Sequence, residues 1–127
     1  MYKIPIELDL KIFLNTNIGQ ICNTVSTITF FFERNSEETG RVHIGFINIS
    51  GRFILEYKRK KNKYDTFPLI NCGLLLNLLE AIVIDIYTDS SRSELTIVFE
   101  NGYKLTLINN EMYESYELSI NGQITYI

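Results

Sequence analysis

Two Asn-Gly pairs, Asn101–Gly102 and Asn121–Gly122, constrain the fold of this chain more than any other feature of its sequence. An Asn-Gly pair between two apolar runs is a strong signature of a β-hairpin, because both residues tolerate a positive φ. In a hairpin, the length of the loop decides which residues face each other across the strands. The sequence around each pair therefore predicts antiparallel strands and separates the residues that face inward from those that face outward.

At the first pair, a two-residue loop would place the apolar residues of the two strands on opposite faces of the sheet. A three-residue loop, Glu100–Gly102, instead pairs Phe99 with Tyr103 and Leu95 with Leu107, so that the large apolar side chains share one face. The usual form of this loop is a type I turn followed by a glycine in the left-handed region. We therefore predict a positive φ at Gly102.

The same reasoning applied to the second pair predicts a loop over Ile120–Gly122, with a positive φ at its glycine. This loop pairs Leu118 with Ile124 and Tyr116 with Tyr126. Tyr116 and Leu118 are then expected to face the core. The residues expected to face outward are Tyr113, Ser115 and Glu117.

The rest of the chain is typical of short strands. Apolar residues stand at every even position from Tyr2 to Leu14, which favours a half-buried strand. A helix is expected from Asn71 to Leu79, with a core-facing stripe of Leu75, Leu78, Leu79 and Ile82. The expected strands are residues 2–14, 25–33, 42–49, 52–57, 82–87, 95–99, 103–107, 113–118 and 124–127.

These elements predict an α+β fold in one domain, residues 1–127. It is dominated by an antiparallel sheet or flattened barrel of nine short strands, with one short helix packed on it. Ser50–Gly51 is expected to join its two flanking strands in a hairpin, and Asn15–Gln20 to form a turn.

Composition argues against several classes of protein. The chain has one histidine, His43, and two cysteines, which are few groups for acid–base chemistry or for a metal site. We therefore expect no catalytic activity, no cofactor and no metal ion. His43 is expected to be a structural strand residue. Lys3, Glu7, Asp9 and Lys11 interrupt the N-terminal apolar positions, so no signal peptide is expected. The longest strongly apolar run, residues 67–79, is too short to span a bilayer, so a cytoplasmic location is the simplest interpretation.

Charge is distributed unevenly along the chain. Residues 58–65 are expected to form a loop, and within it Lys58, Arg59, Lys60, Lys61 and Lys63 place five cations in six positions. Without these five cations, the formal net charge of -3 becomes -8. Tyr57 and Tyr64 flank them, and basic residues with aromatic neighbours can bind a phosphate backbone and stack on bases. A solvated loop without a ligand is the plainer interpretation.

Carboxylates recur at Glu111, Glu114 and Glu117, around an expected loop-to-strand junction. Paired acids can serve glycosidase or metal chemistry, but a solvated acidic rim is the plainer interpretation of this spacing. Asp85 interrupts the apolar run from Ile82 to Tyr87, and a wet face of the strand accounts for it.

One long segment resembles a known family. Residues 74–118 read LLLNLLEAIVIDIYTDSSRSELTIVFENGYKLTLINNEMYESYEL, and IGQICNTVSTITFFF and INISGRFILEY precede them. This pattern is similar to a family of small uncharacterised bacterial proteins, some of which are encoded beside polymorphic toxins and regarded as immunity proteins. The resemblance covers roughly residues 18–118, and its most specific part is the FENG hairpin followed by YESYEL.

The resemblance implies a non-catalytic protein that neutralises a cognate toxin by stoichiometric binding. Cognate toxins of this kind are often nucleases with basic clefts, and carboxylates can mimic the phosphates of the nuclease substrate. The residues expected to bind the partner are Glu111, Tyr113, Glu114 and Glu117. The alternative is a small nucleic-acid-binding module that uses the basic Lys58–Lys63 segment. The oligomeric state stays open.

Overall fold

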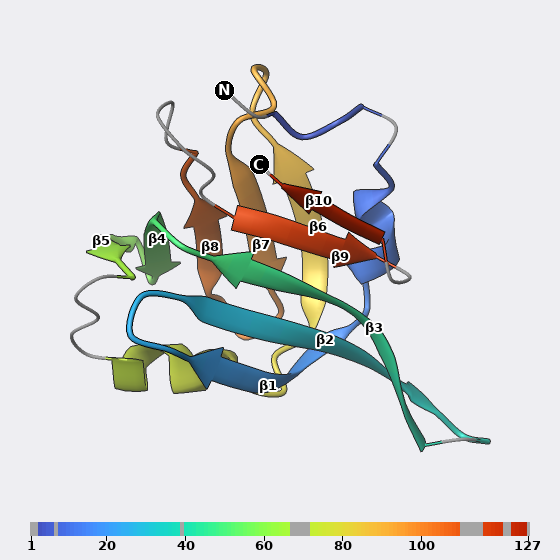
Figure 1. The fold of residues 1–127 in the computed structure, drawn as a ribbon. Coiled ribbons are helices and arrows are strands. Elements are labelled where there is room, and N and C mark those ends of the chain that lie inside the picture. The colour runs from blue at the N-terminus through green and yellow to red at the C-terminus, as the bar shows by residue number, and fades with distance from the viewer. Residues whose placement is uncertain are drawn as a thin grey trace.

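The chain folds into two antiparallel β-sheets that pack face to face, as a computed structural model shows (Figure 1). The structure describes residues 3–6, 8–38, 40–66, 72–109, 116–120 and 123–126. Within these residues it contains ten strands and two short 3-10 helices. The predicted fold class, mainly antiparallel β-structure with a short helix, is confirmed, and the strands form two open sheets rather than a closed barrel.

The two sheets have five strands each. Sheet A has the order β1-β2-β3-β9-β10, and sheet B has the order β5-β4-β8-β7-β6. The helices are η1 (Leu10–Phe13) and η2 (Cys72–Leu78). The strands are β1 (Asn17–Asn23), β2 (Ile28–Ser36), β3 (Gly40–Ile49), β4 (Arg52–Tyr57), β5 (Lys60–Asp65), β6 (Val83–Thr88), β7 (Leu95–Phe99), β8 (Lys104–Leu107), β9 (Tyr116–Ile120) and β10 (Gln123–Tyr126).

The core lies between the sheets, whose strands run across one another in Figure 1. Alternate residues of each strand point into this space, which is the usual arrangement in a β-sandwich. Large apolar side chains fill it, and each one contributes about 1.5–3 kcal/mol when fully buried. The largest of these fully buried side chains are the phenylalanines Phe13, Phe30, Phe32, Phe53 and Phe99.

One edge of the sandwich is closed by backbone hydrogen bonds between the sheets. The Glu80 N–H donates to the Ile18 carbonyl at 2.7 Å, and the Val83 N–H donates to the Thr16 carbonyl at 2.8 Å. The Asn15 N–H donates to the Val83 carbonyl at 2.9 Å. The start of β1 is therefore joined to the segment that leads into β6. We call this junction the seam.

The first Asn-Gly turn has the predicted geometry. Gly102 has a φ of 95°, and its N–H donates to the Phe99 carbonyl at 3.1 Å. Leu95 pairs with Leu107 as the register analysis predicts, and both side chains are buried.

The prediction for the second turn is wrong. Ile120 pairs directly with Gln123, and Leu118 pairs with Thr125, so the loop has two residues rather than three. Gly122 itself lies outside the described residues. Tyr116 and Leu118 do face the core, where they pair with Ile49 and Ile47 of β3. Because β3 fixes β9, the edge strand β10 is free to expose Ile124.

Residues 2–14 do not form the predicted strand in their described part. The Asp9 carboxylate accepts a hydrogen bond from the Lys11 N–H at 3.1 Å and caps η1 instead. Phe13, which has the parity expected to face solvent, is buried with its ring centroid 4.9 Å from that of Phe32. Ile6, which has the parity expected to face the core, is 81% exposed.

The predicted helix is a 3-10 helix, and this changes its buried face. Leu75 and Leu78 are buried, whereas Leu79 and Ile82 are exposed. Leu75 and Leu78 are three apart and share one face of the 3-10 helix, whereas the helix ends at Leu78, so Leu79 and Ile82 lie beyond it and do not follow that face. The predicted stripe is therefore correct for two of its four residues.

Three connections also differ from the prediction. Ser50–Gly51 is not a hairpin turn, because β3 and β4 lie in different sheets and the chain crosses the core edge there. Within the expected loop 58–65, only Lys58–Arg59 is a turn, and the rest is β5. The expected turn Asn15–Gln20 lies mostly in β1, whose Gly19 occupies a bulge.

No helix within the described ranges is long and apolar enough to cross a membrane.

Substitution of Gly102 tests the left-handed turn. Gly102→Ala should lower the free energy of unfolding by about 1–2 kcal/mol, because a Cβ is disfavoured at a φ of 95°. The matched control is Gly73→Ala in η2, where a Cβ would meet no atom within 4 Å. The control should leave stability unchanged or raise it by about 0.4–1 kcal/mol. Urea unfolding followed by circular dichroism measures both, and equal effects would contradict the predicted strain.

Candidate binding surfaces

The basic segment forms the tip and edge strand of the β4–β5 hairpin. Lys58 and Arg59 make the two-residue turn with φ values of 50° and 68°, and both are exposed. The other three cations lie along β5, which is an edge of sheet B: Lys60, Lys61 and Lys63, all exposed. The structure thus brings the five predicted cations together. Lysines on an edge strand also discourage pairing with the sheet of another molecule.

The tyrosines that flank this segment are already in contact with other side chains. Tyr57 stacks on Tyr103 with ring centroids 4.3 Å apart, and the Lys58 ammonium lies 5.3 Å from the Tyr57 centroid. Tyr64 is half-buried and stacks on Phe53 with centroids 5.5 Å apart. Each tyrosine thus has an aromatic neighbour within the protein, and Tyr57 is still 36% exposed.

Of the four residues predicted to bind a partner, the structure describes Glu117. Glu111, Tyr113 and Glu114 lie outside the described residues. Glu117 lies on β9, half-buried on the face of sheet A that points away from the core, as its predicted outward orientation requires.

Glu117 ends a row of hydrogen-bonded side chains that crosses three strands. The Thr29 hydroxyl on β2 donates to Oδ1 of Asn48 on β3 at 2.7 Å. The Asn48 side-chain amide donates to Oε1 of Glu117 at 2.9 Å. The row follows the strand register, in which Thr29, Asn48 and Glu117 are cross-strand neighbours. We call it the polar row.

The polar row borders a pocket of about 320 Å³ on this outer face. Phe31 and Phe46, which face each other across β2 and β3, form its apolar wall with ring centroids 6.0 Å apart. The residues that line the pocket are Thr27, Thr29, Phe31, Phe46, Asn48 and Glu117. Of these six residues, the sequence indicates only Glu117 as a site residue, because the alternation of β2 and β3 does not reveal which polar residues become neighbours.

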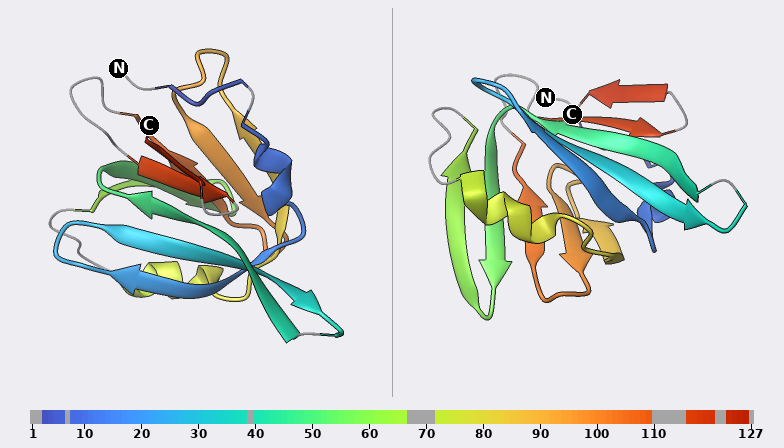
Figure 2. Two further views of the ribbon diagram at one scale, coloured as in Figure 1. Left: turned by 45° about the vertical axis from the view of Figure 1, so that its right-hand side comes forward. Right: turned by 90° about the horizontal axis from the view of Figure 1, so that it is seen from below.

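A second surface carries exposed apolar side chains along η2 and β6, which Figure 2 shows leading into one another. Six of the eleven exposed large apolar residues in the described ranges fall within residues 74–87. They are Leu74, Leu76, Leu79, Ile82, Ile84 and Tyr87, and we call them the apolar strip. The sequence signal for this surface is the continuous run of Leu and Ile. The predicted helix places two of these residues, Leu79 and Ile82, in the core instead.

The charged residues within the apolar strip itself are acidic. Glu80 and Asp85 lie within it and are exposed, and residues 64–91 contain no lysine or arginine, but Arg41 of β3 pairs with Glu80 at 2.8 Å. Asp85 follows a bulge in β6, and its carboxylate accepts a hydrogen bond from the Ile86 N–H at 2.9 Å. The predicted wet face at Asp85 is therefore confirmed. β6 and the basic strand β5 are opposite edges of sheet B.

His43 is an exposed residue of β3, as the structural interpretation predicts, with its ring 6.2 Å from that of Phe31. Within the described ranges, no three His, Cys, Asp or Glu side chains are grouped to hold a metal ion.

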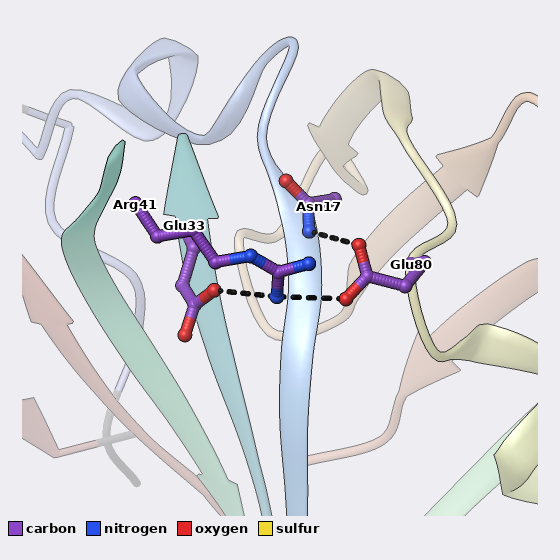
Figure 3. Close-up of polar contacts among 4 residues, drawn as sticks. All are labelled: Asn17, Glu33, Arg41 and Glu80. Carbon is purple, nitrogen blue, oxygen red and sulfur yellow. Dashed lines mark hydrogen bonds and ion pairs between the residues drawn. The ribbon is translucent and has the colours of Figure 1, made fainter. Parts of the chain in front are cut away.

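A polar cluster ties the β2–β3 hairpin to the seam (Figure 3). The Arg41 guanidinium lies between two carboxylates, 3.1 Å from Glu33 and 2.8 Å from Glu80. The hydrogen bonds that Arg41 donates, first to Glu80 and then to Glu33, raise the pKa of Arg41. The Glu80 carboxylate also accepts from the Asn17 side-chain amide at 3.0 Å. Gly19 leaves the space for Glu33, since a Cβ there would collide with its carboxyl group.

The β6–β7 loop fixes the other end of the sandwich. The Arg92 side chain donates to the Ile4 and Pro5 carbonyls, both at 2.7 Å. The Tyr116 hydroxyl of sheet A donates to the Ser93 carbonyl at 2.9 Å, and burial raises the pKa of Tyr116 far above its usual value.

Asp89 organises the same loop. Its carboxylate accepts from the N–H groups of Glu94 and Ser93 and from the hydroxyl groups of Ser91 and Ser93. The hydrogen bond from the Glu94 backbone is the largest cause that lowers the pKa of Asp89 from 3.8 to about 2. The ionised carboxylate is therefore the form that the folded loop favours.

Comparisons with known proteins found no matching family model, curated protein or solved structure.

The lowered pKa of Asp89 predicts a pH dependence of stability. The contribution of the ionised carboxylate is complete above the unfolded value of about 3.8 and disappears as the pH falls towards about 2. Asp89→Asn keeps an oxygen acceptor for the loop but cannot titrate. The free energy of unfolding should therefore decrease less between pH 5 and pH 2 in this variant than in the native protein. Urea unfolding at both pH values measures the difference, and parallel decreases would contradict the prediction.

Proposed function

We propose that the protein is a non-catalytic inhibitor of the immunity type, which neutralises a cognate bacterial toxin by stoichiometric binding in the cytoplasm. The observation that carries the proposal is the apolar strip, with its exposed leucine and isoleucine side chains beside the carboxylates of Glu80 and Asp85. The sequence resemblance to immunity proteins supports the same function.

The strip has the character of a protein-binding surface. Exposed apolar residues that gather on one part of a surface mark sites of interaction, because their burial in a complex is favourable. Ile84, on the edge strand of sheet B, is 54% exposed, and Leu76 on η2 is 60% exposed. A nucleic-acid surface would instead be polar and strongly basic.

The charge beside the strip favours a basic partner. Within the described part of residues 66–91, Glu80 is paired with Arg41 and Asp89 is bonded within its own loop, which leaves the exposed carboxylate of Asp85 to face a partner. Charge complementarity accelerates association and selects among partners. A nuclease toxin with a basic cleft fits this surface, because carboxylates there take the place of nucleic-acid phosphates.

A charged residue in the strip should abolish neutralisation. Ile84→Asp places a carboxylate where the partner buries an apolar side chain, so we expect a loss of affinity of at least about tenfold. The assay is growth rescue on co-expression with a toxin encoded by an adjacent gene, together with binding measured on the purified pair.

The matched control is Val25→Asp, which makes the same kind of change in the β1–β2 turn at a residue that is 80% exposed. It should neutralise like the native protein, and circular dichroism should show both variants folded. Equal neutralisation by both variants, or no binding to any protein encoded nearby, would count against the proposal.

The second candidate function is nucleic-acid binding through the cationic edge of the β4–β5 hairpin. The observation that favours it is the gathering of five exposed cations on one turn and one edge strand. The stacking of Tyr57 on Tyr103 weighs against it, because one face of each ring is already covered. Contact with phosphate groups, which depends steeply on salt, would then supply most of the affinity.

A salt titration separates the two functions. If all five cations contact phosphates, the affinity for a single-stranded oligonucleotide should fall with a log–log salt slope of about -3.5. The test variant carries Asn at residues 58 and 59, where φ is positive, and Thr at residues 60, 61 and 63. It should lose oligonucleotide binding and keep toxin neutralisation. Fluorescence anisotropy measures the binding, and a flat salt dependence would exclude the second candidate.

A further inference from the structure

Among the residues that the structure describes, the carboxylate of the pocket beside the polar row has no counter-charge. Within these residues Glu117 accepts one hydrogen bond, from Asn48, and forms no ion pair. The six residues that line the pocket include no basic side chain. A half-buried carboxylate in this setting favours a cationic ligand, because it retains acceptor capacity and has lost part of its hydration.

The direction of the hydrogen bonds in the polar row decides which acceptors remain for a ligand. Thr29 donates to Asn48, and Asn48 donates to Glu117, so the protons of the row all point towards the carboxylate. Oδ1 of Asn48 uses one lone pair for Thr29 and has a second one. The row thus offers two neighbouring acceptors, the Glu117 carboxylate and the Asn48 carbonyl oxygen, to one ligand that carries several donors.

The aromatic wall selects the shape of the cation. Phe31 and Phe46 present ring faces and edges beside the acceptors, with their planes tilted by 52°. A planar guanidinium packs against such rings and forms two parallel hydrogen bonds, whereas an ammonium group is a compact point charge. At about 320 Å³, the pocket lies at the small end of the range for ligand sites, which suits a single side chain.

We infer that this pocket receives the guanidinium group of an arginine side chain presented by the protein partner. Three adjacent strands, β2, β3 and β9, supply its walls, so the acceptors are held in place before the ligand arrives. The inference rests on the proposed function for the identity of the partner, and it names the side chain that the partner contributes.

A blocked tripeptide tests the pocket without the toxin. We expect Ac-Gly-Arg-Gly-NH2 to shift the amide resonances of Thr29, Asn48 and Glu117 in the 15N-labelled full chain. The corresponding citrulline peptide has the same shape and no charge and should bind at least about tenfold more weakly. The lysine peptide should also bind several-fold more weakly, because it lacks the planar fork.

The decisive variant is Glu117→Gln, which keeps an acceptor for Asn48 and removes the charge. It should weaken arginine-peptide binding at least about tenfold, while Glu37→Gln, the same change in the exposed β2–β3 turn, should leave binding unchanged. Phe46→Leu provides a second test, since it keeps an apolar wall but removes a ring and should weaken binding several-fold. Dispersed spectra confirm that each variant is folded.

Several results would overturn the inference. These are equal binding of the arginine and citrulline peptides, unchanged binding by Glu117→Gln, or tighter binding of free arginine than of the blocked peptide, which would indicate a metabolite site. The outcome is independent of toxin neutralisation. Failure of the peptide to bind while the toxin is neutralised refutes only the pocket, and the reverse result refutes only the proposed function.

Discussion

The seam on which the two sheets depend is a short set of backbone hydrogen bonds between β1 and the segment before β6. Its geometry requires Glu80 to adopt a φ of 63°, which directs the Glu80 N–H to the Ile18 carbonyl. A non-glycine residue in the left-handed region is unfavourable unless its surroundings fix it. Here the Glu80 carboxylate is held by Arg41 and Asn17, so the side chain supports the backbone that closes the core.

The seam also explains where the exposed chemistry lies. The seam joins one edge of each sheet, at β1 in sheet A and beside β6 in sheet B. The opposite edges of the two sheets are β10 and β5. The basic side chains follow β5, and the apolar strip emerges directly beside the seam, where η2 ends and β6 begins. The uneven charge of the sequence thus becomes a physical separation across the five strands of sheet B.

Local turn chemistry could be predicted from the sequence, and the pairing of distant strands could not. The loop ending at Gly102 joins two strands whose inward residues depend on each other, so register alone decides it. The predicted length of the loop before Gln123 is wrong. The register of β9 is fixed by β3, over sixty residues away, and no described side chain of β10 lies in the core to fix the register of that strand. The strand predicted from the alternation of residues 2–14 is wrong for a similar reason. The Asp9 cap and the burial of Phe13 favour the helix η1 over a strand there.

The candidate sites follow the same division. Glu117 could be found because its outward direction follows from local parity, but its neighbours Thr29 and Asn48 belong to strands that meet it only in the folded sheet. The apolar strip could not be predicted because the helix ends at Leu78, before Leu79 and Ile82, and both residues are exposed beyond it. A partner with a basic surface is repelled by β5 and attracted to the acidic residues near β6. The charge separation therefore orients such a partner towards the strip before any contact forms.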